Sequence, residues 1–394
     1  MSRFDFPERR AVISGLGQSK VGRPLPQSGF QITLDAILAA IKDAGLNISD
    51  IDGLATYPGM TVNFAPGFVG PDIYEIQDAL GLQLNWHLGT PQGAAQITPL
   101  IHAVLAVAGG LCRHAVVFRT VTEASGQAGG GRAGLGAGLS EVDGPMSWLL
   151  SVGAVSAANW AALYAHRHMH EYGTTKEQLG QVAITARAHA AGNPDAIFTK
   201  PLTMDDYLSS RPISTPLSLY DCDIPVDGCT AVIVSTVDAV ADLRSPVRVE
   251  AMGGAIRHRP LWEQWDDLTM MASHDAADQM WSRTDLRPSD VDVAQLYDGF
   301  TIFTLMWLEA LGFCNKGESG AFVEGGTRIR LGGDLPVNTW GGQLSGGRLH
   351  GYGFVAEAIR QLRGEAGVRQ VTDAEVAAVG IGGGTIGGSL LLTR

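Results

Sequence analysis

The sequence predicts an α/β protein built from two similar halves, and three observations support this. The chain has 394 residues, more than one hydrophobic core usually holds. The segment LNISDIDGLATYPG (46–59) aligns with LRPSDVDVAQLYDG (286–299) at a constant offset of 240. Strand-like and helix-like stretches alternate in the same order around both copies. We therefore expect mixed sheets covered by helices on both faces.

The elements of the two halves correspond in order. A strand ending in glycine opens each half, AVISGLG (11–17) and VRVEAMGG (247–254), and an apolar helical pattern follows each. After the repeated segment, residues 89–110 and 350–367 both read as a glycine-containing loop, a helix and a glycine stop. A buried strand is expected after each of these helices.

The residues between these elements suggest an insertion. We expect a first half of residues 1–119 plus 220–245, an inserted loop domain of residues 120–219, and a second half of residues 246–394. The glycine-rich run GQAGGGRAGLGAGLSEVDG (126–144) is expected to be a mobile loop beside the functional site. A phosphate-cradling role for this run stays open but has weak support, because no strand precedes it and no helix follows it.

Composition and charge exclude several classes of protein. Hydrophobic residues make up 45% and charged residues 17%, and no window approaches 18 consecutive apolar residues, so neither disorder nor a membrane span is expected. The first residues lack the apolar stretch of a signal peptide, which favours a cytoplasmic location. Four scattered cysteines form no metal-type spacing. A net charge of −12 disfavours nucleic acid but leaves a small anionic ligand open.

Two long segments carry a family resemblance. RPISTPLSLYDCDIPVDGCTAVIV (211–234) and HEYGTTKEQLGQVAITARAHAAGNPDA (170–196) resemble the sterol-carrier-protein type of thiolase. The resemblance implies the thiolase fold, in which duplicated βαβ-rich halves form a five-layered αβαβα core with an inserted loop domain over its mouth. It also implies a homodimer formed through the core and an acyl-coenzyme A (acyl-CoA) ligand.

The reactive positions of thiolases are altered in this chain. Thr90 stands at the nucleophilic cysteine, Arg348 at the histidine of the Gly-His-Pro motif, Tyr297 at the second histidine and Gly380 at the final cysteine. The nearby Cys112 is expected to pack in the core. Covalent acyl transfer through a cysteine is therefore disfavoured.

The replacements resemble another branch of the same superfamily. YDGF (297–300) and HGYG (350–353), on a framework without the cysteine, are similar to the thiolase-like aldolases of steroid side-chain degradation, also described as lipid-transfer-protein-type aldolases. The resemblance implies retro-aldol cleavage of a 17-hydroxy steroid acyl-CoA to a 17-ketosteroid and propionyl-CoA, with no cofactor and no metal. It also implies a small partner with an OB fold and a zinc ribbon, giving a heterotetramer.

Retro-aldol chemistry assigns roles to particular residues. It needs a base for the β-hydroxyl, stabilisation of the thioester enolate, and an acid for the enolate carbon. Tyr297 is interpreted as the base and Tyr352 as the acid, with the reverse assignment open. Backbone N–H groups near Thr90 and at Gly382 are expected to support the enolate.

Three further residues are candidates for support. Arg348 and His350 lie close in sequence to Tyr352 and could favour the phenolate of a catalytic tyrosine. Asp298 either orients its neighbours or stabilises a loop.

Less specific interpretations remain beside these. A tyrosine after a strand commonly just packs, and Tyr57, the repeat partner of Tyr297, offers symmetry as an explanation. His166 and His170 share a helix face at a metal-compatible spacing, but without a third ligand a solvated face is favoured. A thiolase-like acyltransferase and a non-catalytic acyl-CoA-binding subunit remain alternative functions.

Overall fold

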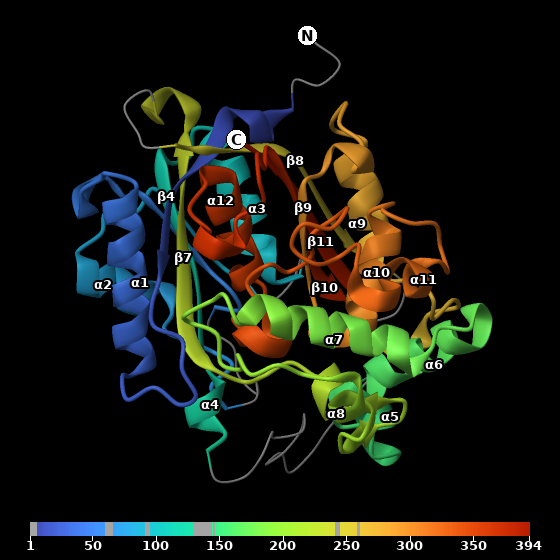
Figure 1. The fold of residues 1–394 in the computed structure, drawn as a ribbon. Coiled ribbons are helices and arrows are strands. Elements are labelled where there is room, and N and C mark those ends of the chain that lie inside the picture. Colours follow the sequence, from blue (N-terminus) through green and yellow to red (C-terminus); the bar gives the residue numbers. More distant parts are fainter. Residues whose placement is uncertain are drawn as a thin grey trace.

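The architecture is a mixed sheet with helical layers on and between its two halves (Figure 1). The structure, a computed structural model, describes residues 6–59, 66–90, 95–128, 144, 146–240, 245–257 and 261–394. In this part of the chain nine strands are hydrogen-bonded in the order β3-β2-β4-β7-β1-β8-β11-β10-β9. They are β1 (Ala11–Gln18), β2 (Gly53–Thr56), β3 (Trp86–Gly89), β4 (His114–Thr122), β7 (Asp227–Thr236), β8 (Val247–Ile256), β9 (Val293–Leu296), β10 (Val376–Gly383) and β11 (Ile386–Thr393).

The sheet consists of two equivalent halves. The order β2-β4-β7-β1 in the first matches β9-β10-β11-β8 in the second, with the same parallel and antiparallel pairings. The halves join through a short antiparallel pairing of β1 with β8, which covers Val12 with Arg248 and Ile13 with Val247. The predicted repeat is confirmed, because β2 and β9 begin 240 residues apart.

The repeated aspartates explain why the motif recurs. Asp52 accepts hydrogen bonds from the backbone N–H groups of Arg113 and His114, where β4 begins. Asp292 accepts the equivalent bonds from Glu375 and Val376, where β10 begins. Each carboxylate thus fixes the register between two neighbouring parallel strands.

The helices form the other layers, and across Figure 1 the order is helix, sheet, helix, sheet, helix, as the predicted five-layered fold requires. In the first half α1 (Gly29–Asp43) and α2 (Ile73–Leu80) lie outside, and α3 (Thr98–Ala108) lies on the inner face. In the second half α9 (Ala272–Trp281) and α10 (Thr301–Ala310) lie outside, and α12 (Tyr352–Arg363) lies on the inner face.

Strand β4 shows why the sheet is buried on both faces. Val116 and Phe118 belong to the apolar cluster under α1, whereas Ala115 and Val117 belong to the large central core. Successive side chains of a strand point to opposite faces, so the run of apolar residues 115–118 supplies both layers of core.

Glycines permit the outer helices to pack closely on the sheet. A Cβ atom at Gly17 would lie 2.1 Å from the carbonyl oxygen of Ala36 on α1. One at Gly253 would lie 2.0 Å from the carbonyl oxygen of Ala276 on α9. Both halves therefore use a glycine for the same close approach.

The inserted segment between β4 and β7 packs mainly against the second half. Its described elements are α4 (Glu123–Gly126), α5 (Met146–Ser151), α6 (Ala157–Tyr172), α7 (Lys176–Ala190), α8 (Met204–Leu208), β5 (Pro212–Ser214) and β6 (Leu217–Ser218). Helices α6 and α7 contact α10, and α7 also contacts α11 (Ser319–Val323). Most of the predicted glycine-rich loop, residues 129–143, lies outside the described residues. None of the described helices has the length and apolarity required to cross a membrane.

Candidate active site

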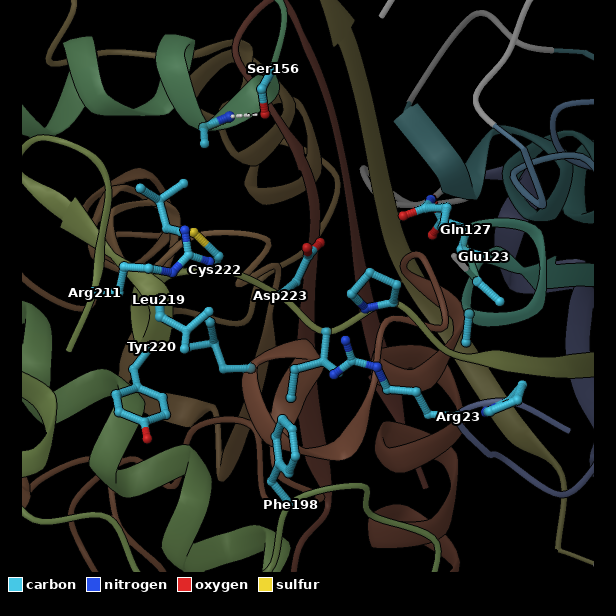
Figure 2. A pocket seen from close by; sticks show the side chains of 18 of the residues that line it. Arg23, Glu123, Gln127, Ser156, Phe198, Arg211, Leu219, Tyr220, Cys222 and Asp223 are labelled. Atoms are coloured by element: carbon cyan, nitrogen blue, oxygen red, sulfur yellow. Dashed lines mark hydrogen bonds between the residues drawn. The ribbon is translucent and has the colours of Figure 1, made fainter. Parts of the chain in front are cut away.

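Two adjoining cavities lie where several strands end and two inner helices begin. The inner cavity, of about 270 Å³, is bordered by residues after β2 and β9, at the end of β10, and just before α3 and α12. The outer cavity, of about 890 Å³, lies beside the inserted segment (Figure 2). Four residues line both cavities, namely Glu123, Gln127, Ser156 and Asp223. The two cavities therefore share one boundary.

Tyr297 lines the inner cavity, as expected of a catalytic residue. It follows β9, and its backbone N–H donates to the carbonyl of Gly380 at 2.8 Å. Its ring bends back over Gly299, where a Cβ atom would lie 2.7 Å from the ring carbon Cε1. The ring also packs near Phe303 and Phe354. The glycine of the Tyr-Asp-Gly sequence thus leaves room for the tyrosine ring.

Asp298 anchors a loop. It is not one of the described residues that line the two cavities. Its fully buried carboxylate accepts hydrogen bonds from the N–H of Gln343 at 2.8 Å and from Nδ2 of Asn338 at 3.2 Å. Burial raises the pKa of Asp298 to about 8, and the negative charge of Asp223 adds to this increase. Gly342 is required there, because a Cβ atom would overlap the carboxylate. Of the two roles considered for Asp298, these contacts support loop stabilisation.

Arg348 joins the two carboxylates at the boundary of the cavities. It pairs with Glu123 at 3.0 Å and with Asp223 at 3.1 Å, and all three side chains are largely buried. Burial lowers the pKa of Arg348, but the charges of Glu123 and Asp223 outweigh it and leave the pKa raised. The guanidinium is also close enough to interact electrostatically with Tyr297 and Tyr57. Arg348 is thus a permanent cation beside the predicted base.

His350 lies in the wall of the inner cavity on a cluster of buried groups. Its Nδ1 accepts hydrogen bonds from Arg119, at 3.0 Å from Nη2 and 3.3 Å from Nε. Its Nε2 lies 3.2 Å from the side-chain amide nitrogen of Gln96. The rings of Tyr57 and Phe68 pack against the imidazole, with centroids 5.7 and 4.6 Å away.

Tyr352 is placed differently from Tyr297. It begins α12, is fully buried, and does not line either cavity as described. Burial raises the pKa of its phenol, although the charge of Arg119 partly opposes this. Its hydroxyl has no hydrogen-bond partner among the described residues. The structure therefore brings Tyr297, Arg348, His350 and Gly382 to one cavity, and the catalytic role of Tyr352 stays a prediction.

The glycine-rich end of β10 forms another part of the inner wall. Gly382 and Gly383 line the cavity, and Gly382 has a positive φ of 97° that favours glycine. The carbonyl of Gly382 accepts a hydrogen bond from the indole of Trp307 at 3.0 Å. Thr90 follows β3 and precedes residues 91–94, which lie outside the described residues, so the expected N–H donors of that loop stay a prediction.

Cationic and aromatic side chains border the outer cavity. Arg23 and Arg211 border it and are exposed (Figure 2). Arg187 is buried and donates from Nε to Ser345 Oγ at 2.8 Å. The Arg187 guanidinium lies over the rings of Phe198 and Tyr220. Such a wall suits an anionic ligand with a flat ring.

Sequence reasoning missed several residues of the inner cavity. Gln96, Glu123 and Asp223 line it, and Arg119 lies against His350. Asp223 belongs to the segment 211–234 that carries the family resemblance, but nothing in that segment marked it as a cavity residue. Tyr57 also lines the inner cavity. Its offset of 240 residues from Tyr297 was the signal that could have identified Tyr57 as a cavity residue.

Cysteine and metal chemistry are not supported by the described residues. Cys112 is buried in the core as expected, and burial raises its pKa to about 12. His166 and His170 are exposed on α6, and no group of three or more potential metal ligands occurs in the described part of the chain.

Comparisons with known proteins agree with this architecture. Residues 253–392 match the family model "Thiolase C-terminal domain-like". The chain is 36% identical over 389 residues to the steroid side-chain-cleaving aldolase of Thermomonospora curvata, covering 97% of each chain. It is 35% identical to the 17-hydroxy-3-oxo-4-pregnene-20-carboxyl-CoA lyase of Mycobacterium tuberculosis, covering 97% and 99% of the two chains. A solved structure of the "Ltp2-ChsH2(DUF35) aldolase" superposes with a TM-score of 0.87 at 33% identity, covering 98% of each chain.

Proposed function

Because the chain belongs to the thiolase-fold family of steroid side-chain-cleaving aldolases, we propose that it cleaves a 17-hydroxy steroid acyl-CoA by a retro-aldol reaction. The products are a 17-ketosteroid and propionyl-CoA. The observation that carries the proposal is the match to two such enzymes over 97% of the chain, combined with a cavity that holds Tyr297 beside Arg348.

The proposed reaction gives each of these groups a role. Tyr297 as phenolate takes the proton of the 17-hydroxyl, and the oxygen electrons form the ketone C=O bond. The C–C bond breaks, its electron pair moves to the carbon next to the thioester, and the negative charge spreads to the thioester oxygen. A proton from the acid, assigned to Tyr352, completes propionyl-CoA. The substrate loses its hydroxyl proton to Tyr297 and gains one from Tyr352, so its atoms balance. Proton exchange with solvent then returns Tyr297 to the phenolate and Tyr352 to the phenol.

The positive charge of Arg348 supports the role of Tyr297. A free tyrosine with a pKa near 10 is a weak base at neutral pH, and a neighbouring cation favours its phenolate. Arg348 is held in place by Glu123 and Asp223 and stays charged because its pKa is raised. Glu123 and Asp223 line both cavities, so this network lies at their shared boundary.

The outer cavity suits the coenzyme A portion of the substrate. Arg23 and Arg211 provide exposed positive charge for phosphate groups, and Phe198 and Tyr220 provide aromatic surface for a flat base. The shared boundary leads from this cavity to the inner one, where aromatic side chains that include Trp160, Trp262 and Phe303 suit the apolar acyl portion. This arrangement needs no cofactor other than the thioester of the substrate.

We also propose a homodimer and a complex with a small OB-fold and zinc-ribbon partner. Strand β3 lies at an edge of the sheet, and His87 and Gly89 on it are exposed, so its backbone can pair with a second chain. The name of the similar solved aldolase includes a DUF35 partner. With two copies of each chain the assembly is a heterotetramer.

The experiment is direct. The chain, alone and with the partner, is incubated with a 17-hydroxy steroid acyl-CoA, and both products are followed by mass spectrometry. We expect equal amounts of 17-ketosteroid and propionyl-CoA. Absence of both products when the partner is present would reject the aldolase function and leave the acyltransferase and the non-catalytic acyl-CoA-binding subunit as the remaining interpretations.

A further inference from the structure

A buried arginine lies behind the inner cavity, and no carboxylate of the described residues forms an ion pair with it. Arg119 on β4 is 1% exposed, and the described residues place no acidic group within ion-pair distance of it. Its guanidinium donates to the carbonyl of Thr120 and to His350, and it lies near the rings of Phe68 and Tyr57, at 4.8 and 5.4 Å from their centroids. Burial lowers the pKa of Arg119 to about 10, so it remains charged at neutral pH. Burying an unpaired charge is costly, and stability alone does not account for it.

The hydrogen bonds from Arg119 determine the state of His350. A guanidinium only donates, so Nδ1 of the imidazole must be the acceptor. The ring is then neutral and its proton resides on Nε2. A second proton on Nδ1 would remove the hydrogen bond and place two cations in contact.

Gln96 continues this chain of donors. Its amide nitrogen lies 3.2 Å from His350 Nε2, while its Oε1 has no hydrogen-bond partner among the described residues. The amide nitrogen of Gln96 and the Nε2–H of His350 are both donors, so they cannot form a hydrogen bond with each other. Rotating the Gln96 amide by 180° places its Oε1 against Nε2–H, and this satisfies both atoms. The NH₂ group of Gln96 is then left to donate toward the cavity that Gln96 and His350 both line.

Gln96, the last donor in this series of hydrogen bonds, lies beside the glycine-rich end of β10. Gln96 follows Ala95, and a Cβ atom at Gly382 would lie 2.6 Å from the Cβ of Ala95. A Cβ atom at Gly351 would lie 3.2 Å from the Cβ of Gln96. The donor groups thus lie next to the part of the cavity wall where we expect the enolate to be stabilised.

From these contacts we propose that the side-chain NH₂ group of Gln96 donates a hydrogen bond to the thioester oxygen as it becomes the enolate oxygen, and that His350 and Arg119 are positioning residues that keep this amide oriented as a donor. The inference rests on the proposed retro-aldol function. Oriented donors backed by a buried cation stabilise an anion more than a neutral carbonyl, so their effect belongs to the transition state. Loss of these donors therefore lowers kcat more than it raises KM.

The test uses variants that separate the donors from the packing. Gln96→Leu and Arg119→Met remove hydrogen bonding, whereas Arg119→Lys keeps a charged donor. We expect kcat to fall by about 100-fold or more in the first two, the loss known for one oxyanion donor, with KM within about threefold. Arg119→Lys should recover part of the rate. Gln77→Leu removes a side-chain hydrogen bond to Leu82 on the outer surface and serves as the matched control.

Two readouts keep this inference distinct from the proposed function. If the wild-type complex turns over, retention of kcat within threefold by folded Gln96→Leu and Arg119→Met would overturn the inference. If the wild-type complex does not turn over, the proposed function fails, and calorimetric affinities for carboxymethyl-CoA, whose carboxylate mimics the enolate, and for the matched S-alkyl thioether then decide. We expect the wild type to prefer the carboxylate and Gln96→Leu to lose that preference. An unchanged preference in Gln96→Leu would overturn the inference in that case.

Discussion

Tyr57 and Tyr297, which are 240 residues apart, occupy equivalent positions after β2 and β9 and line the same inner cavity. The duplication thus brings one phenol from each half to a single site. The surroundings of the two differ, because Tyr57 packs beside His350 and Arg119, whereas Tyr297 packs beside Phe303 and Phe354.

Replacing Tyr297 by phenylalanine is expected to remove most of the activity. The variant keeps the ring that packs over Gly299 but lacks the group that accepts the hydroxyl proton. General base catalysis commonly contributes about 10²- to 10⁴-fold, so kcat should fall by that order while the melting temperature stays nearly unchanged. Tyr74→Phe, at an exposed tyrosine on α2, is the control. Full activity in Tyr297→Phe would remove this residue from the mechanism.

Tyr352→Phe separates stability from catalysis unusually well. The hydroxyl of Tyr352 is buried without a partner among the described residues, so deleting it should leave the free energy of unfolding unchanged or raise it by about 1 kcal/mol. If the phenol is the acid, kcat nevertheless falls by at least tenfold. Urea unfolding and steady-state rates measure the two effects, and an undiminished kcat would show that Tyr352 only packs.

Arg348→Met should destabilise the fold as well as impair cleavage. Removing the guanidinium leaves Glu123 and Asp223 buried and close together without their cation. Breaking a buried ion pair in this way costs about 3–5 kcal/mol. Urea unfolding should show this loss, and the additional change Glu123→Gln should recover part of it. Unchanged stability of Arg348→Met would mean that the ion pairs contribute nothing to the fold.

Asp298 should make stability depend on pH. Its pKa in the folded protein is about 8, above the value of 3.8 for an unperturbed aspartate, so the folded state holds this proton more tightly than the unfolded state. Its contribution is complete below about pH 4 and is lost as the pH rises to about 8, a loss on the order of a few kcal/mol. Asp298→Asn should therefore become more stable relative to wild type as the pH rises across this range. A difference that is constant from pH 4 to 8 would contradict the raised pKa.

No acyl group should become attached to a cysteine during turnover. Burial raises the pKa of Cys112, Cys229 and Cys314 to about 12, so these thiols remain protonated and unreactive. Intact-protein mass spectrometry after incubation with acyl-CoA should show the unmodified mass. Alkylation of all four cysteines after denaturation provides the control, and an acyl adduct on any of them would restore the acyltransferase interpretation.

Much of the site could be anticipated because its anchors are local in sequence. Tyr297 and Gly299 are neighbours, so the turn that accommodates the ring was visible in the sequence YDGF. Arg348 was identified through its motif position, but its partners Glu123 and Asp223 lie 225 and 125 residues away in the sequence and share no spacing with it. The pairing of Arg119 with His350 spans 231 residues and was equally hidden.

The sequence by itself determined the duplicated architecture, because the repeated aspartates, the strand glycines and the apolar alternation act over short distances and leave a regular pattern. Only the tertiary structure decided which tyrosine side chains line the inner cavity and which arginine lies behind the cavity wall. Side-chain direction at the start of α12, and the burial of Arg119 beneath His350, result from packing between the two halves, and such contacts between distant segments leave no periodic signal in one chain.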